Sequence, residues 1–488
     1  MWIHTFKSLL LILPIIGAVI LIINDEGDSG HKLAWLLTIA LLPAVGLILY
    51  LCFGLNQRHH WLFKRHHRRF TDLYDREHDQ AMERLLFSPE NEKYIKEVFR
   101  PLARLLGKGL LRVSSGNDFE IITSGRRKFE LLMEDLRNAK ESIHMEYFRF
   151  GSDRGGRAIR DLIQQKAAEG VKVRFINENL ANFPISARYY NQMRKYGVEV
   201  VRFTSPRQNI VRLITKLNYR NHRKIVVIDG KIGYTGGMNI NDKYFLSWRD
   251  THLRITGDAV ASLQFIFMDS WLTAGGTIDK PLTEYFRPVR NMEWPDAGSP
   301  HTPVMRNKPM MIVPDEPDAP IPIIQMSYEW GLFNAKEYFY IQTPYFAPPE
   351  SVLNAMKAAA SQGVDIRLML PREVDTPLML AANRSYYREC LEAGVRIFER
   401  GGEFIHSKTF VMDGYLSSIG TANLDNRSFS INYETNAYIF DEEAALRCRE
   451  IFEEELGICR EITLAEVEEW PRLRKFWQKF IRLFAPLL

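Results

Sequence analysis

An internal repeat sets the fold of most of this chain. Residues 139–147, AKESIHMEY, are similar to residues 335–343, AKEYFYIQT. Each segment is followed by a helical stretch that ends at glycine and then by a second apolar strand. Strands that alternate with helices of this length predict a mainly parallel or mixed sheet with helices on both faces. The sequence therefore predicts an α/β fold built twice, with one half at 111–280 and the other at 323–463.

Proline marks the connection between the two halves. Ten of the 23 prolines fall within residues 281–322. Proline has no N–H to donate to a sheet and cannot continue a helix. This segment is therefore predicted to be a linker rather than part of either half.

One polar motif, H-x-K-x4-D, occurs at the same place in both halves. Its members are His222, Lys224 and Asp229 in the first half and His406, Lys408 and Asp413 in the second. A single copy would be weak evidence, whereas two copies at matching places in a repeat are strong evidence for a shared site. These six residues are the candidate catalytic residues.

Strand geometry divides the polar residues of the motif into two groups. The histidine and the lysine are two positions apart beside a run of β-forming residues, so their side chains share one face. The aspartate is an odd number of positions away, which predicts that Asp229 and Asp413 point to the other face and bond the following turn. Glu146 and Gln342, at the end of the first strand of each half, either reach the site as well or are ordinary polar residues at the sheet edge.

Two further pairs of polar residues match downstream of the motif. Asn239 corresponds to Asn423, and Asp250 corresponds to Glu434, each acid lying 28 residues after the histidine of its half. A carboxylate that accepts from the second ring nitrogen of a histidine fixes its tautomer and orientation. The two acids are therefore candidates for orienting the histidines, and the sequence leaves open which histidine each one serves.

Paired histidines suit the chemistry of a phosphodiester. One, unprotonated, attacks phosphorus, and the other, protonated, donates to the leaving alkoxide. Lys224, Lys408, Asn239 and Asn423 supply donors for the phosphate oxygens, where negative charge is concentrated in the transition state. No acidic cluster has metal-ligand spacing, so the sequence predicts neither a metal nor a cofactor.

Two apolar runs at the N-terminus, residues 8–23 and 33–53, predict a transmembrane hairpin of two helices. The second run is long enough for a hydrocarbon core and the first is marginal. A cleaved signal peptide is the alternative for the first run, but no small-residue cleavage site follows it. The loop between the runs is acidic and residues 57–69 are basic, which places both termini in the cytoplasm. The hairpin and its basic flank form residues 1–69, and residues 70–110 are predicted to be connecting helices.

The C-terminal segment, residues 464–488, is predicted to form a basic amphipathic helix. Large apolar residues fall on one broad face, namely Phe476, Trp477, Phe480, Ile481, Leu483 and Phe484. Arginine and lysine occupy much of the rest. Such a helix either lies on an anionic membrane surface or docks on the core of the protein, and both interpretations stay open. The basic segment 207–217 shows the same pattern more weakly.

The duplicated motif, with its glycine, asparagine and later acid, resembles the phospholipase D superfamily. Closer features resemble the bacterial-type cardiolipin synthases: the two-helix N-terminus and the segments 218–224 (NYRNHRK), 248–252 (WRDTH), 343–346 (TPYF) and 486–488 (PLL). The resemblance covers nearly the whole chain. It implies two pseudo-symmetric α/β/α sandwich halves that share one active site, and a ping-pong reaction through a phosphatidyl-histidine.

The same resemblance implies substrates, roles and a location. Two molecules of phosphatidylglycerol would give cardiolipin and glycerol, with His222 as the nucleophile and His406 as the general acid. The protein would be a multi-pass enzyme of the bacterial cytoplasmic membrane that contacts anionic lipid. Its catalytic part would lie on the cytoplasmic side.

Composition limits the competing functions. The 64 basic and 59 acidic residues leave a formal charge of +5, which is too mild to favour a nucleic-acid partner or a nuclease. Four cysteines without a CxxC exclude a disulfide framework and a zinc site. A scaffold with a decayed site is disfavoured because both halves keep every expected catalytic residue. A hydrolase that releases phosphatidic acid stays open, as does the oligomeric state.

Overall fold

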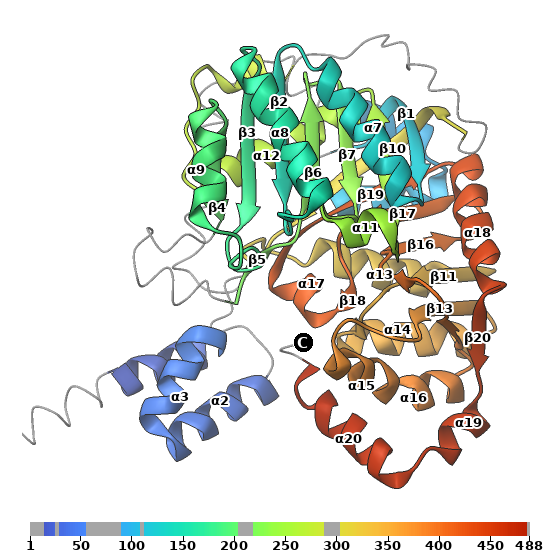
Figure 1. Ribbon diagram of the computed structural model, residues 1–488. Helices are drawn as coiled ribbons and strands as arrows, with labels where there is room; N and C mark the ends of the chain where they lie inside the picture. Colours follow the sequence, from blue (N-terminus) through green and yellow to red (C-terminus); the bar gives the residue numbers. More distant parts are fainter. Residues whose placement is uncertain are drawn as a thin grey trace, which may run out of the picture.

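The computed structural model describes residues 14–24, 29–54, 89–107, 112–203, 218–286 and 303–485 (Figure 1). The basic segments 57–69 and 207–217 lie outside the described residues. The same is true of the start of the first apolar run and of part of the proline-rich segment.

A single mixed β-sheet runs through both halves of the molecule (Figure 1). Its strands follow each other in the order β20 (Cys459–Ile462), β14 (Arg396–Arg400), β13 (Asp365–Pro371), β11 (Tyr338–Gln342), β16 (Thr409–Met412), β17 (Leu416–Gly420), β19 (Asn432–Phe440), β10 (Met305–Asp315), β1 (Ser114–Ile122), β9 (His252–Thr256), β7 (Ile232–Gly236), β6 (Lys224–Ile228), β2 (Ser142–Tyr147), β3 (Lys172–Glu178) and β4 (Glu199–Phe203). The two halves meet at β19, β10 and β1, so the sheet is continuous across the junction.

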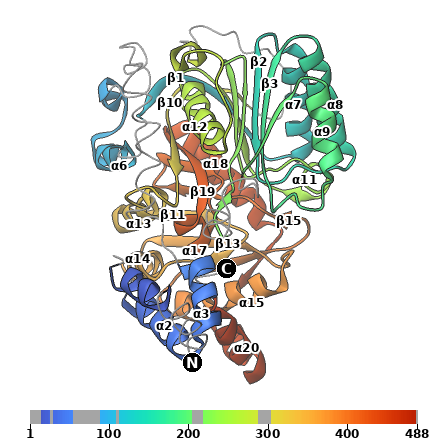
Figure 2. The same cartoon turned by 90° about the vertical axis from the view of Figure 1, so that its left-hand side faces the viewer.

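Each half contains the predicted alternation of parallel strands and helices. In the first half β2, β3 and β4 are parallel, and α7 (Gly125–Asn138), α8 (Arg154–Ala168) and α9 (Ala187–Lys195) cover one face. Figure 2 shows α12 (Ala259–Thr273) on the opposite face, where nearly all of its residues are buried. The apolar residues of α7 and α8 recur at helical spacing, which gives each helix one face for the sheet.

The second half repeats this arrangement with its own elements. Strands β11, β13 and β14 are parallel, and the helices are α13 (Ile323–Asn334), α14 (Glu350–Ser361), α15 (Pro377–Ser385), α16 (Tyr387–Glu392) and α18 (Glu442–Leu456). The predicted α/β fold of two related halves is therefore confirmed. The connecting elements η3 (Glu97–Phe99) and α6 (Arg100–Leu106), which follow η2 (Pro89–Tyr94), pack into the core of the second half, although they precede the first half in the sequence.

Part of the predicted proline-rich linker is a central strand instead. Strand β10 lies between β1 and β19 and includes Pro309 and Pro314. Pro314 lies beyond Met310, the last residue of β10 that pairs with β1, and Pro309 falls at an irregularity in that pairing. Pro314 also pairs with Thr435 of β19, but the carbonyl of Thr435 accepts the N–H of Thr421 on its other side, so the nitrogen of Pro314 faces the β1 side, where pairing has ended. The strand therefore tolerates both prolines.

The N-terminal apolar segment forms several short helices. Residues 14–24 are helical, and they are followed by α2 (Ser29–Leu41), α3 (Pro43–Leu49) and the π-helix η1 (Tyr50–Gly54). The predicted continuous helix over residues 33–53 is therefore wrong. Leu42 has non-helical dihedrals and Pro43 begins the next helix. Proline has no N–H to donate to the preceding turn, and its ring disfavours a helical conformation for the residue before it. None of the described helices is both long enough and apolar enough to cross a membrane.

The chain ends in two helices, α19 (Leu464–Glu469) and α20 (Arg472–Arg482). Helix α20 packs against α15, and Figure 1 shows it at the same end of the molecule as α2 and α3. Its buried residues are Gln478 and Ile481.

Candidate active site

Two short strand pairs carry each catalytic motif into the opposite half. Strand β5 (Arg220–Asn221) of the first half pairs with β19, and β15 (Phe404–Ile405) of the second half pairs with β8 (Trp248–Arg249). The backbone N–H of His222 donates to the carbonyl of Tyr433 at 2.9 Å, and that of His406 donates to the carbonyl of Arg249 at 2.7 Å. Each histidine is thus held beside the residue that precedes the acid of the other half.

Each histidine is therefore oriented by a carboxylate from the other half. His222 donates from Nδ1 to both carboxylate oxygens of Glu434 at 3.0 Å. His406 donates from Nδ1 to Oδ2 of Asp250 at 2.7 Å. The second ring nitrogen, Nε2, is left for chemistry on both rings. The structure thus assigns a histidine to each of the two acids, a question that the sequence left open.

The two acids are held in different ways. Glu434 also accepts hydrogen bonds from Thr421 Oγ1 and from Asn432 Nδ2, the latter at 3.1 Å. Asp250 accepts instead from the backbone N–H of Thr251 at 2.7 Å. Gly237 stands at the position that corresponds to Thr421, and a Cβ there would lie 2.1 Å from Oδ1 of Asp250. The shorter acid thus fills the space that a side chain at position 237 would need.

Two buried lysines bring positive charge to this cluster. The ammonium of Lys224 donates to the carbonyl of His222 at 2.6 Å, and that of Lys408 donates to the carbonyl of His406. Lys408 Nζ also lies 2.7 Å from Nδ1 of His406, but that nitrogen uses its proton for Asp250 and the two groups are only neighbours. Lys224 interacts electrostatically with Lys408 and with both acids, so the two motifs form one site.

Burial lowers the pKa of the two histidines and the two lysines of this site. It lowers the pKa of His222 to about 4, against the opposing effect of Glu434. Burial and Lys408 together lower the pKa of His406 to about 3. Burial also lowers the pKa of Lys408 to about 8 and that of Lys224 well below its ordinary value. At neutral pH the two histidines are therefore neutral, which is the form that a nucleophile or a general base requires.

The acids respond in the opposite direction. Burial works to raise the pKa of Asp250, but Lys408 and His406 outweigh it and hold that pKa below its usual value. His222 and Lys224 do the same for Glu434. Both acids are thus carboxylates, which can accept a hydrogen bond from the N–H of an imidazole ring and stabilise positive charge on that ring.

Aromatic rings surround the two histidines. Phe148 packs edge-on against His222 at 4.8 Å, measured between ring centroids. Tyr244, Trp248 and Tyr345 lie 5.3, 5.4 and 6.4 Å from the ring of His406. These rings limit the access of water to the site, which strengthens its electrostatic interactions. In the sequence, two of these rings belong to segments that resemble the family: Trp248 lies in WRDTH and Tyr345 lies in TPYF.

The motif aspartates are not part of this cluster, and their place among the catalytic residues has to be corrected. The carboxylate of Asp229 accepts the backbone N–H groups of Lys140, Glu141 and Ser142 at 2.7–2.8 Å. Asp413 accepts the corresponding three N–H groups at the start of β11 at 2.8–3.0 Å. Both residues follow the far ends of β6 and β16, away from the lysines. The strand argument that put them on another face was right, but they bond the start of a neighbouring strand rather than the following turn.

The two asparagines differ in how free their amides are. Asn239 donates to the hydroxyl of Tyr244 at 2.7 Å and accepts the backbone N–H of Arg149 at 3.0 Å, so it supports a ring that packs on His406. The side-chain oxygen of Asn423 is buried and accepts no hydrogen bond within the described part of the chain. That oxygen can only accept hydrogen bonds, so a phosphate contact by Asn423 would have to come from its Nδ2 group, which remains a prediction.

Glu146 and Gln342 contact the neighbours of motif residues and not the motif residues themselves. Asn221, which precedes His222, donates to Glu146, and Thr409, which follows Lys408, donates to Gln342 at 3.1 Å. Burial raises the pKa of Glu146. Both residues thus support the segments that carry the motifs and do not touch the histidines.

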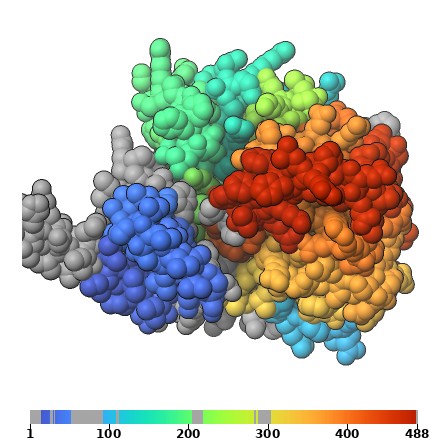
Figure 3. All heavy atoms as spheres, turned by 90° about the horizontal axis from the view of Figure 1, so that it is seen from below, coloured from blue at the N-terminus to red at the C-terminus, as the bar shows by residue number. Residues whose placement is uncertain are grey.

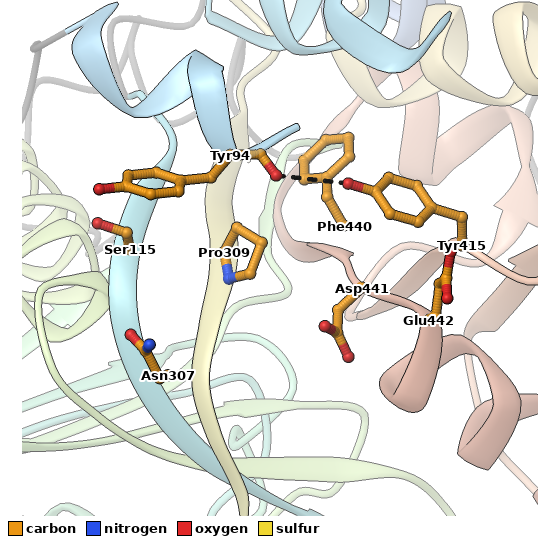
Figure 4. A pocket seen from close by; sticks show the side chains of 8 residues that line it. All are labelled: Tyr94, Ser115, Asn307, Pro309, Tyr415, Phe440, Asp441 and Glu442. Carbon is orange, nitrogen blue, oxygen red and sulfur yellow. Dashed lines mark hydrogen bonds between the residues drawn. The ribbon is translucent and has the colours of Figure 1, made fainter. Parts of the chain in front are cut away.

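A separate cavity of about 390 Å³ lies away from the motifs (Figure 4). Tyr94, Ser115, Asn307 and Tyr415 are among its lining residues, which come from η2, β1, β10 and the segment before β17. No residue of the histidine cluster lines it. Within the described ranges, no group of three His, Cys, Asp or Glu side chains is placed to hold a metal ion.

Comparison with known proteins connects this geometry to a family. Residues 132–271 and 331–456 match the family model described as the cardiolipin synthase, PLD-like domain. Cardiolipin synthase 2 of Bacillus anthracis is 35% identical over 484 residues, which cover 97% of this chain and 90% of the relative. The chain belongs to the cardiolipin synthase family. The predicted resemblance is thus confirmed, and with it the prediction that the chain is an enzyme of the phosphatidyltransferase type.

Other comparisons agree with the family and the fold. The major cardiolipin synthase of Bacillus subtilis is 35% identical over 497 residues, covering 99% of this chain and 98% of the relative. Residues 9–54 match the phospholipase D-nuclease N-terminal family. The crystal structure of a phosphatidylserine synthase from Haemophilus influenzae has a TM-score of 0.57 at 16% identity, covering 81% of this chain and all of that one. This likeness supports the shared fold alone.

Proposed function

We propose that this member of the cardiolipin synthase family transfers a phosphatidyl group between two phosphatidylglycerol molecules and releases glycerol. The observation that carries the proposal is the crossed arrangement of the site. Each half supplies one histidine and one lysine, and also the carboxylate that orients the histidine of the other half. One phosphodiester can be held between two histidines in such a site, with a nucleophile on one side and a proton donor on the other.

In the first step, Nε2 of His222 attacks phosphorus, and the bond from phosphorus to the glycerol oxygen breaks. Because burial keeps His406 neutral in the free site, its Nε2 takes up a proton from water when the anionic phosphodiester binds. His406 then delivers that proton to the glycerol oxygen, so glycerol leaves as a neutral alcohol. The phosphatidyl group is then held on a positively charged imidazole ring, whose Nδ1–H faces the carboxylate of Glu434. Lys224 and Lys408 supply positive charge to the phosphate oxygens, where the transition state is most negative.

In the second step, His406 removes a proton from the glycerol hydroxyl of another phosphatidylglycerol, which attacks phosphorus and displaces His222. A P–N bond breaks and a P–O bond forms, so the energy of the original ester bond is conserved and no activated lipid is needed. The family resemblance assigns the nucleophile to His222. The additional partners of Glu434, Thr421 and Asn432, support this order because the ring beside Glu434 carries the positive charge of the intermediate.

The proposal extends to the location of the enzyme. A hairpin formed by the helices within residues 14–54 would anchor the chain in the bacterial cytoplasmic membrane, and the basic residues 57–69 would keep the catalytic part on the cytoplasmic side. Protease added outside intact spheroplasts should then leave the chain beyond residue 70 uncut. Cleavage there would overturn the orientation.

The decisive test uses purified full-length protein in vesicles of phosphatidylglycerol. Cardiolipin and glycerol should form in near-equal amounts without a nucleotide-linked lipid, and added glycerol should reverse the reaction. Phosphatidic acid as the main product would favour a hydrolase, and cleavage of DNA in place of lipid would favour a nuclease.

Two variants test the roles of the histidines. The His222→Ala protein should be inactive and form no phospho-adduct, whereas His406→Ala should be nearly inactive and retain some adduct on His222. An adduct found on His406 by mass spectrometry would reverse the two roles.

A further inference from the structure

Helix α20 leaves a row of large apolar side chains exposed. Of its surface, Leu473 exposes 79%, Phe476 67% and Leu483, just beyond the helix, 73%. Trp477, Phe480 and Phe484 are exposed by more than two-fifths each and pack on one another, with ring centroids 5.7 and 5.5 Å apart. These six residues, which we call the apolar row, recur at the spacing of one helical face.

The opposite face of α20 is docked on the protein. Gln478, Ile481 and Ala485 are buried, and Arg482 forms an ion pair with Glu389 and lies 4.0 Å from the ring centroid of Tyr386. The docking fixes the rotation of the helix. These tertiary contacts therefore turn the apolar row outward.

A third face of the helix is cationic. At 100° per residue, Arg472, Lys475 and Lys479 fall between the docked face and the apolar row. Helix α20 contains no acidic residue. Basic side chains that border an exposed apolar face can extend to lipid phosphates while the apolar side chains enter the acyl region.

The other exposed apolar helices lie at the same end of the molecule. Leu33, Leu37 and Leu41 on α2, and Val45 and Ile48 on α3, are each more than half exposed. Seen from below, α2 and α3 in blue and α20 in red are both on the side that faces the viewer (Figure 3). Segments from opposite ends of the chain thus present apolar side chains on one side of the molecule.

Helix α20 is also close to the candidate site along a short path of contacts. It packs on α15, and Asp375, two residues before α15, accepts the hydroxyl of Tyr345 at 2.7 Å. The ring of Tyr345 packs edge-on against His406.

We propose that α20 is an interfacial helix, which lies in the surface of an anionic bilayer with the apolar row among the acyl chains and its basic face against lipid phosphates. This contact holds the active site next to its lipid substrate. Only this last statement rests on the proposed function. The contact is distinct from the N-terminal hairpin, because it involves a helix that the folded catalytic part itself positions.

The structural test places an environment-sensitive fluorescent amino acid at position 476 of the full-length protein. Position 333 on α13 is the control, because Phe333 is 63% exposed and so matches Phe476 in type and exposure. In phosphatidylglycerol vesicles the probe at 476 should emit at shorter wavelength and be quenched by lipids with brominated acyl chains, and the probe at 333 should show neither effect.

Each other outcome of this test counts against the proposal. Emission typical of water at position 476 would overturn it. A short-wavelength emission that brominated lipid does not quench would mean that protein covers the row, either from this chain or from a second copy. Equal quenching in phosphatidylcholine and phosphatidylglycerol vesicles, insensitive to salt, would overturn the role of the basic face.

The functional test compares the double variant Phe476→Gln/Phe480→Gln with Phe333→Gln. The double variant should lose about tenfold or more in kcat/KM on phosphatidylglycerol vesicles, because it removes two aromatic side chains that the bilayer would bury. Its rate on a short-chain phosphatidylglycerol dissolved as monomers should match that of the unmodified enzyme. An equal loss on both substrates would contradict an interfacial role. No transfer by the unmodified enzyme would refute the proposed function, and the fluorescence result would still decide the inference about α20.

Discussion

Replacing Gly237 by alanine tests whether Asp250 must stay within hydrogen-bonding distance of His406. A Cβ at this position would lie 2.1 Å from Oδ1 of Asp250 and 2.7 Å from its Cγ, while real Cβ contacts are essentially never shorter than 3.0 Å. The φ of Gly237 is not positive, so alanine is free of backbone strain there and the effect is steric alone. The carboxylate must therefore move by about 0.9 Å, the difference between 3.0 and 2.1 Å.

The displacement falls on the bond that orients His406. Asp250 is fully buried, and its Oδ2 lies 2.7 Å from Nδ1 of His406. A misplacement of about 1 Å in a catalytic group costs about 10²-fold in rate. We expect Gly237→Ala to lose about that factor in the initial rate of glycerol release from phosphatidylglycerol vesicles.

The control is Gly401→Ala, where the nearest atom to a new Cβ is 3.5 Å away. It should keep the full rate, and thermal unfolding should show that both variants are folded. The arrangement of the other half also offers a rescue, since Thr421 and Glu434 occupy the corresponding positions there. Gly237→Thr combined with Asp250→Glu should therefore be faster than Gly237→Thr alone. A Gly237→Ala enzyme that keeps more than half of its rate, when Asp250→Asn is strongly impaired, would refute the reasoning.

Three other variants and one matched control separate catalytic from structural contacts. Glu434→Gln should lower kcat by about 10²-fold or more, though less than His222→Ala, because the ring loses the carboxylate that stabilises its positive charge; an unchanged kcat would contradict the crossed pairing. Asp229→Ala should lower the free energy of unfolding by about 2 kcal/mol, because three backbone N–H groups lose their acceptor, and kcat of the folded enzyme should stay within about twofold. Lys128→Met should lower kcat by about tenfold, because this buried ammonium donates at 2.7 Å to the carbonyl of the residue before Asn239 and so holds the loop beside Asp250. The matched Lys166→Met, which removes a lysine bonded to a backbone carbonyl and to an exposed glutamate, should lower the melting temperature and leave kcat unchanged.

Local patterns in the sequence were enough for the architecture of each half. The period of the apolar residues sets strand or helix, and a glycine after each helix sets its end. The repeat therefore predicted a mainly parallel or mixed sheet in each half, and the structure contains the parallel pairs β2–β3 and β11–β13. The alternation of side chains along a strand likewise separated Asp229 and Asp413 from the histidines. These properties depend on neighbours in the chain, which a sequence shows directly.

Local patterns failed where a neighbouring strand or helix decided the outcome. The prolines of β10 indicated a linker, but pairing with β19 on one side and an irregular ladder on the other made it a central strand. The apolar run over residues 33–53 indicated one helix, and Pro43 divided it. In the C-terminal helix, the sequence indicated an amphipathic segment, and only docking on α15 showed which face is covered.

The sequence by itself identified the two histidines, the two lysines and the two later acids of the site, because the motif is repeated and its chemistry is specific. It did not determine how they combine. The equal spacing of 28 residues between each histidine and the acid of its own half carries no information on whether those two residues meet. Only the pairing of β5 with β19 and of β15 with β8 brings His222 to Glu434 and His406 to Asp250. Contacts between residues that are distant in the chain depend on how the two halves pack, and that packing is a property of the whole fold.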